Sequence, residues 1–226
     1  SQQRSITRHL DWKYKISYKN KDYQDFSTIS ISDLDYQSLA FANQLNFKKT
    51  KKHQDTVALE LSQRQYKDKR QKDIKGNDIS NTDLTYLDAN INYQHLWQHT
   101  KRHKVSISLD YLQRKDNGRG YYDSQESTVK VSSIYRINAK STLNGYYQYQ
   151  EFNYDRPSDN SADTTTEEYS SHQQHKIKIS SQVSLKAYLP VNAQWLVAYQ
   201  YLNEDSDKSQ YTYERHILET GLRFKF

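Results

Sequence analysis

Carboxylates and histidines are the side chains in this sequence that could perform acid–base chemistry. Glu204, Asp205 and Asp207 stand in one polar segment, and Asp155 and Asp159 stand in another. A pair of carboxylates, or a carboxylate beside a histidine, can activate water for hydrolysis. No aspartate adjoins a histidine in these segments. We therefore interpret these carboxylates as solvated charge and predict no catalytic residues.

The sequence also contains few residues in patterns that bind a metal ion or a cofactor. His172, His175 and His216 could approach one another, but their spacing matches no known ligand signature, and cysteine is absent. Gly118 and Gly120 fall in a short polar segment that predicts a turn, and no glycine-rich phosphate loop is present. We expect no metal site and no cofactor.

The elements that must position these side chains are β-strands, because apolar and polar residues alternate along nearly the whole chain. Even positions are apolar in 10–18, and odd positions other than Ser181 are apolar in 177–189. On a helix, residues two apart lie on nearly opposite sides, so a helix would scatter each stripe. The pattern predicts about ten strands. Further alternating segments are 39–47, 57–61, 87–97, 105–111, 129–137, 143–149, 193–201 and 218–226.

Composition narrows the class of this β-protein. The 226 residues fit one domain, 1–226, with a mean hydropathy of -1.12 and 34% hydrophobic residues. A chain this polar could be disordered, but 21 tyrosines argue against disorder. No apolar run reaches the ~18–20 residues of a transmembrane helix. A membrane β-barrel remains, since its strands need only ~9–11 residues with apolar side chains at alternate positions.

The connections alternate between short and long. Outer-membrane barrels have short periplasmic turns and long extracellular loops, so ten strands would place both chain ends in the periplasm. We predict a closed antiparallel transmembrane β-barrel; a soluble β-sandwich or soluble barrel is the alternative. The predicted short links lie near 51–54, 100–103, 138–140 and 190–192, and the long links near 20–27, 68–81, 115–123, 156–166 and 203–209.

Large aromatic residues gather at the predicted periplasmic rim of the apolar face. An indole ring favours the membrane interface because it joins an apolar body to an N–H donor. The predicted interface aromatics are Trp12, Trp97, Trp195, Phe47, Phe224 and Phe226.

The alternation also predicts which charged residues line the barrel lumen. One interpretation is a narrow lumen filled by mutually neutralising charges; the other is a cation-lined path that favours anions. The net charge of +6 could equally reflect attraction to anionic lipid headgroups. The basic residues are too dispersed to indicate nucleic-acid binding. The predicted lumen-lining residues are Lys13, Lys15, Glu60, Arg64, Asp88, Asp110, Lys130, Arg136, Lys176, Lys178, Lys186, Glu219 and Arg223.

The segment from Tyr213 to Phe226 resembles the closing strand of Gram-negative outer-membrane proteins. Phe226, Phe224, Leu222, Thr220 and Leu218 match the alternating pattern that ends on an aromatic residue. The resemblance implies an outer-membrane location, contact with outer-membrane lipid and lipopolysaccharide, and recognition by the barrel-assembly machinery. A start at Ser1 is consistent with a removed signal peptide.

Ten-stranded barrels also include the omptin proteases of the outer membrane. The loop carboxylates match their paired-carboxylate pattern only in part, so we favour a protein that is not an enzyme. We expect a porin-like transport or export component, or the membrane anchor of a cell-envelope assembly. The alternative is a surface scaffold or receptor that binds a protein or glycan through tyrosine-rich outer loops.

Overall fold

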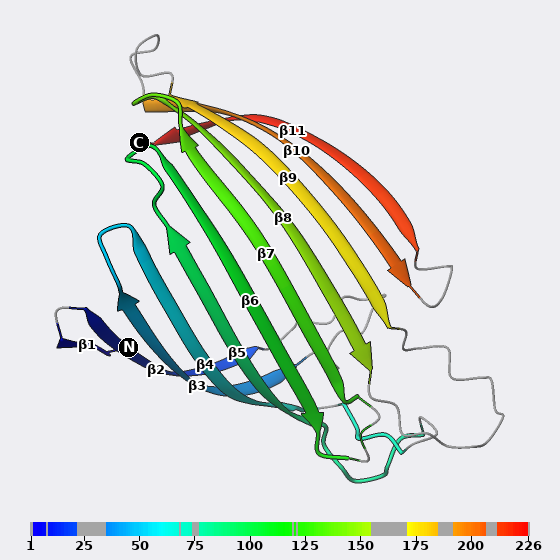
Figure 1. Cartoon of the computed structure of the whole chain (residues 1–226). Coiled ribbons are helices and arrows are strands. Elements are labelled where there is room, and N and C mark those ends of the chain that lie inside the picture. Colours follow the sequence, from blue (N-terminus) through cyan, green and yellow to red (C-terminus); the bar gives the residue numbers. More distant parts are fainter. Residues whose placement is uncertain are drawn as a thin grey trace.

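The computed structural model describes residues 2–7, 9–21, 35–67, 69–73, 77–118, 120, 122–154, 171–184, 192–206 and 212–225. Within them the chain forms eleven strands in one antiparallel sheet, whose order follows the sequence (Figure 1). No helix in these ranges is long and apolar enough to cross a membrane. The strands are β1 (Gln2–Thr7), β2 (Leu10–Lys21), β3 (Tyr36–Lys48), β4 (His53–Tyr66), β5 (Thr85–Trp97), β6 (His103–Asp116), β7 (Ser124–Arg136), β8 (Ser141–Tyr154), β9 (His172–Ser184), β10 (Asn192–Ser206) and β11 (Tyr213–Lys225).

The first strand was not expected from the sequence. The segment Gln2–Thr7 contains a single large apolar residue, Ile6, and so lacks the alternation that marks the other strands. β1 nevertheless pairs with β2, with Gln2 opposite Tyr14. The expected ten strands correspond to β2–β11. The placement of both chain ends in the periplasm stays a prediction, and Gln2, the first described residue, lies opposite Tyr14 near the middle of β2.

The described part of the sheet is open at its edges. No ladder joins β1 to β11 among the paired strands. Neighbouring strands alternate in direction, so β1 and β11 run the same way, and a direct pairing between them would be parallel. Closure into a barrel therefore remains a prediction.

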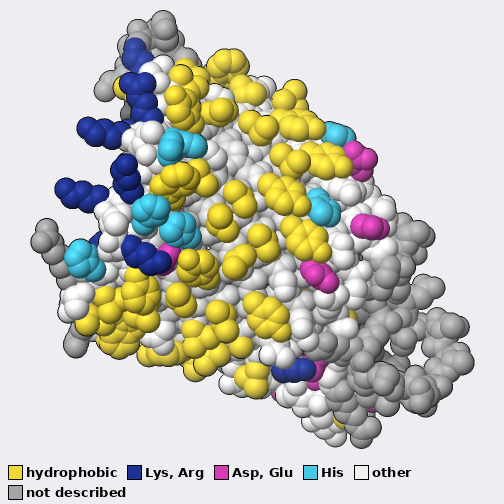
Figure 2. All heavy atoms as spheres, in the orientation of Figure 1, with side chains coloured by type: hydrophobic (Ala, Val, Ile, Leu, Met, Phe, Trp, Pro, Cys, Tyr) yellow, Lys and Arg dark blue, Asp and Glu magenta, His cyan; other side chains and the backbone are white. Residues whose placement is uncertain are grey.

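The two faces of the sheet differ in chemistry as the alternation predicted. The apolar face carries exposed side chains such as Leu59, Ile91 and Ile179 (40%, 53% and 52% exposed). Asp88 and Asn46 on the other face, which we call the polar face, are buried (9% and 5%). The polar side chains are thus less exposed than the apolar ones. We infer that the sheet curves so that its polar face lies on the inside of the curve. Figure 2 shows the hydrophobic side chains spread across the outer surface of the sheet.

The links between strands fall close to their predicted positions, with shifted boundaries. Residues 49–52, 98–102 and 137–140 form tight turns at one end of the sheet, which we call the short-turn end. Strands β2, β4, β6, β8 and β10 end at the opposite end of the sheet, which we call the long-link end. β9 ends at Ser184, so the predicted continuation of this strand to residue 189 lies outside the described residues.

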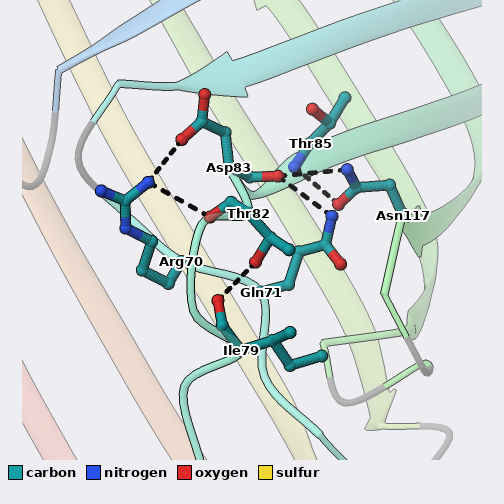
Figure 3. A network of polar contacts seen from close by, with 7 residues as sticks. All are labelled: Arg70, Gln71, Ile79, Thr82, Asp83, Thr85 and Asn117. Carbon is teal, nitrogen blue, oxygen red and sulfur yellow. Dashed lines mark hydrogen bonds and ion pairs between the residues drawn. The ribbon is translucent and has the colours of Figure 1, made fainter.

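The link between β4 and β5 folds on itself at the long-link end. Lys72 and Asp78 form an isolated antiparallel β-bridge through their backbones, and the Ile79 N–H donates to the Gln71 carbonyl (2.8 Å). Figure 3 shows how this link is tied to its neighbours: Asn117 accepts from the Thr85 N–H (2.9 Å) and donates to the Asp83 carbonyl (3.1 Å). The small buried cluster of the described chain, Leu84, Tyr86 and Tyr122, lies beside this link.

Candidate functional site

The predicted lumen residues come together on the polar face. Residues directly opposite in a β-ladder share a face, and the registers relate the described members of the set to one another in this way. Lys15 and Glu60 both pair with Ala42, for example, and Lys130 and Lys176 both pair with Gln148. Lys186 lies outside the described residues.

Acidic residues lie on β4, β5 and β6 of the polar face. Glu60 is exposed. Asp110 accepts hydrogen bonds from the amides of Asn90 (3.3 Å) and Asn92 (2.9 Å). Asp88 forms a two-pronged ion pair with Arg114, a residue that the sequence reasoning did not single out.

Basic residues lie on β7, β9 and β11 of the same face. The Lys130 ammonium stands 4.3 Å from the centre of the Tyr146 ring, a favourable cation–π distance. Lys178 pairs with Glu219 at 3.6 Å. Together with Gly221 and Arg223, this pair lines a hollow of 380 Å³ over β9–β11. The hollow shows that side chains leave free space on this part of the face.

The charges on the polar face neutralise one another only in part. No ion pair within the described ranges involves Glu60, Asp110, Lys130 or Lys176. The inward cations were expected to pair mostly with inward carboxylates or polar amides, and Lys178 and Glu219 form one such pair. Asp88 has a different partner from those expected, and Arg223 has no ion pair within the same ranges. The face is mixed in charge: Lys15 on β2 shares it with Glu60, and Arg64 and Arg114 lie on β4 and β6.

Arginine–tyrosine contacts occupy the long-link end of the polar face. Arg64 stacks over Tyr36 (4.9 Å) and donates to the Tyr66 hydroxyl (3.4 Å). Within the part of the chain that the structure describes, the Arg64 Nε has no hydrogen-bond partner. Arg114 stacks over Tyr86 (4.9 Å). Alternation could place these side chains on one face but could not identify the contacts, which depend on the register between strands.

Two aspartates build the link between β6 and β7. Asp116 accepts from the backbone N–H groups of Gly118, Gly120 and Tyr122 at 2.8, 3.1 and 2.8 Å. Gly120 has a positive φ of 82°, which glycine adopts without strain. Asp123 accepts from the Asp116 N–H (2.8 Å). The predicted turn is therefore confirmed within the described residues, and its carboxylates are used in backbone hydrogen bonds.

The three histidines considered as metal ligands do not meet. His172 lies on the polar face and stacks on Phe152. His175 and His216 lie on the apolar face, and each is hydrogen-bonded to a tyrosine hydroxyl (2.9 and 2.8 Å). No group of three or more metal-ligating side chains occurs in the part of the chain that the structure describes.

An aspartate–histidine pair that the sequence analysis missed lies at the short-turn end of the apolar face. Asp55 stands opposite His95 in the β4–β5 ladder, with 2.6 Å between Oδ1 and Nδ1. Asp55 also accepts from the Tyr93 hydroxyl (3.0 Å) and pairs with Lys49 at 2.5 Å. This hydrogen bond and the nearby charge raise the pKa of Lys49. Asp55 is saturated with donors, which favours a structural role.

The predicted interface aromatics lie on the apolar face toward the short-turn end. The Trp12 N–H donates to Asn43 (3.0 Å), and the Trp195 N–H donates to Thr220 (3.0 Å). Trp97 stacks on His53. Phe47 and Phe224 are 36% and 47% exposed, and Phe226 lies outside the described residues. The indole N–H groups of Trp12 and Trp195 thus each have a polar partner, while their rings lie on the apolar face.

The tyrosines considered for an outer binding surface and the loop carboxylates considered for catalysis lie in different environments. Tyr122 is buried, and Tyr146 lies beneath Lys130 on the polar face. Glu204 accepts from Gln174 and Tyr213 (2.9 Å each). Residues 121, 155, 159, 169, 207 and 211 lie outside the described ranges.

A curved antiparallel sheet with an apolar outer face and a polar inner face is the arrangement of outer-membrane β-barrel proteins. The sequence matches no protein-family model and no curated protein. By structure the chain is similar to OmpT (in-vitro folded), an outer membrane protein of Vibrio cholerae. The TM-score is 0.52 at 7% identity, covering 98% of this chain and 86% of that chain. The likeness shows a shared all-β fold.

Proposed function

We propose that this chain is a transport or export component of the outer membrane of a Gram-negative bacterium, with its polar face lining the path. Charged side chains without an ion-pair partner on that face carry the proposal. Within the described residues, Lys130 and Lys176 on β7 and β9 and Glu60 and Asp110 on β4 and β6 form no ion pair. Unpaired charges are costly in a dry interior, so their presence favours a water-filled space over a plugged one.

The basic residues of β7, β9 and β11 favour anions. These strands bring Lys130, Lys176, Lys178 and Arg223 to one part of the face, and among the described residues only Lys178 is paired with a carboxylate there. Basic side chains that line a pore attract anions and raise their local concentration. We therefore propose a modest preference for anionic solutes.

Conductance in planar lipid bilayers tests this function. Wild-type protein should give stable channels with a reversal potential on the anion-selective side in a salt gradient. Lys130→Gln/Lys176→Gln should shift that potential toward cation selectivity. Arg70→Gln/Lys72→Gln removes the same charge from the β4–β5 link and should shift it much less. A bilayer-inserted protein without conductance would contradict a transport path.

A membrane anchor or a surface scaffold is the second candidate. The observation that favours it is the folded β4–β5 link, held by Arg70, Gln71 and Asn117 at the long-link end. A link with this much internal hydrogen bonding offers a firm surface for a protein or glycan. A silent but correctly inserted protein that co-purifies with an envelope partner would favour this role. An omptin-like hydrolase is the least favoured function, and we expect no peptidase activity.

A further inference from the structure

The short-turn end of the sheet carries a continuous cationic rim. We define this rim by six exposed residues of the tight turns and the adjoining strand start. Figure 2 shows lysine and arginine side chains along this end, with histidines between them and the hydrophobic surface. None of the six has an acidic partner among the described residues. The rim residues are Lys51, Lys52, Lys101, Arg102, Lys104 and Lys140.

Two of the turns repeat one sequence pattern. Residues 50–53 read Thr-Lys-Lys-His, and residues 100–103 read Thr-Lys-Arg-His. In each turn the threonine hydroxyl accepts from the N–H groups two and three residues on, at 3.0–3.2 Å. The cations of both turns therefore project from the same backbone shape.

Backbone hydrogen bonds hold the turns side by side. The Gln98 N–H donates to the Lys52 carbonyl (2.7 Å), and the Arg136 N–H donates to the Arg102 carbonyl (2.8 Å). The Ser184 N–H donates to the Lys140 carbonyl (2.7 Å). The three turns are thus bonded to the chain at the ends of β5, β7 and β9, respectively. The cations therefore form a row instead of isolated charges.

A histidine–tryptophan band separates the rim from the apolar surface. His53 stacks on Trp97 (6.2 Å between ring centres), Trp97 contacts His99 (4.8 Å), and His99 contacts His103 (6.0 Å). The order from apolar surface to amphipathic rings to exposed cations follows the order of a membrane leaflet from acyl chains to interface to phosphates.

We propose that the rim binds the phosphate groups of anionic phospholipids in the leaflet at the short-turn end. The proposal rests on the proposed function, because it requires the apolar face to lie in a bilayer. Charge complementarity identifies the occupant: cations without an acidic partner surround the edge of an apolar surface where headgroup phosphates would lie. Lysine and arginine donors suit phosphate oxygens.

The three tryptophans provide the probe, since all lie toward this end of the apolar face. The protein is refolded into phosphatidylcholine vesicles that contain 20% of either brominated phosphatidylglycerol or brominated phosphatidylcholine, with bromines near the headgroup. Preferential quenching by the anionic lipid should correspond to a relative association constant of at least about threefold at low salt, and it should fall toward one in high salt.

The matched variants locate the effect. Lys51→Gln/Lys52→Gln/Arg102→Gln should bring the relative constant close to one. Lys67→Gln/Arg70→Gln/Lys72→Gln removes equal charge at the long-link end and should retain the preference. Equal quenching by both lipids in the wild type, or equal loss in both variants, overturns the headgroup site while leaving the barrel intact. Failure to insert into either vesicle, seen as unshifted tryptophan emission, overturns the proposed function as well.

Discussion

Arg114 forms a bidentate ion pair with Asp88 across the β5–β6 ladder, with Nε donating to Oδ1 at 2.7 Å and Nη2 donating to Oδ2 at 3.1 Å. The side chains of Asp88 and Arg114 are 9% and 25% exposed. Removal of one partner leaves the other charge poorly solvated. Asp88→Ala should therefore lower the free energy of unfolding by about 2–4 kcal/mol, measured by urea unfolding in lipid vesicles.

Two comparisons separate this effect from a general loss of charge. Asp88→Leu/Arg114→Met removes both partners and should cost clearly less than Asp88→Ala. Asp83→Ala breaks the Arg70–Asp83 pair, in which both side chains are 45% exposed, and should cost about 0–1 kcal/mol. Equal losses for Asp88→Ala and Asp83→Ala would show that the Arg114 pair has no special weight.

The apolar face can be tested at adjacent residues of one strand. Ile179 lies near the middle of β9 on the apolar face, and Ser180 follows it on the polar face. An arginine on the lipid face near the bilayer midplane costs ~2–4 kcal/mol, whereas a water-filled interior tolerates charge. Ile179→Arg should lower folding stability in lipid by this amount, and Ser180→Arg should be much milder.

A soluble sheet would also reject a charge at a packed position, so exposure to lipid must be measured directly. A spin label at Ile179 should be accessible to oxygen, which concentrates in the bilayer, and a label at Ser180 should not. Equal accessibility at the two positions would contradict the assignment of the apolar face to lipid.

The strands and their faces were predictable because alternation is a local property of the sequence. The segment 10–18 corresponds to β2, and the intrusion of Asn43 into an apolar stripe is explained by its hydrogen bond to Trp12. β1 was missed because Gln2–Thr7 has no apolar stripe. The expected extension of β9 past Ser184 lies outside the described residues.

Pairings between strands were not predictable, because alternation does not determine which residues stand opposite one another. Asp55 and His95 are far apart in sequence, and only the β4–β5 register brings them together. The same holds for Asp88 and Arg114. Alternation therefore predicted which charged residues share the polar face, but it did not predict which of them pair with one another.

The hydrogen-bond cluster around Asp55 should stabilise the short-turn end. Asp55 is nearly inaccessible (7% of its side chain is exposed) and accepts from His95, Tyr93 and Lys49. Asp55→Ala leaves these donors without their acceptor and should lower the free energy of unfolding by about 2–3 kcal/mol. Asp11→Ala, which removes the partner of the half-exposed Lys48, should cost about 1 kcal/mol or less. Similar values for both would contradict a special role for Asp55.

Barrel closure gives the last prediction. Bacterial single-chain barrels have an even number of strands, all antiparallel. Here β1 and β11 run in the same direction, whereas β2 and β11 run in opposite directions. We therefore expect β11 to pair with β2 in lipid, in place of the short and irregular β1. Disulfide cross-linking tests this pairing. The chain has no cysteine, so disulfides between pairs of introduced cysteines can be detected without interference.

Tyr14→Cys or Ile16→Cys should form a disulfide with one of Leu218→Cys, Thr220→Cys or Leu222→Cys, seen as a shift in gel mobility that a reductant reverses. Gln2→Cys or Thr7→Cys should not cross-link to the same positions. Cross-links from β1 alone would indicate a parallel closure, and none from either strand would show that this chain does not close its sheet by itself.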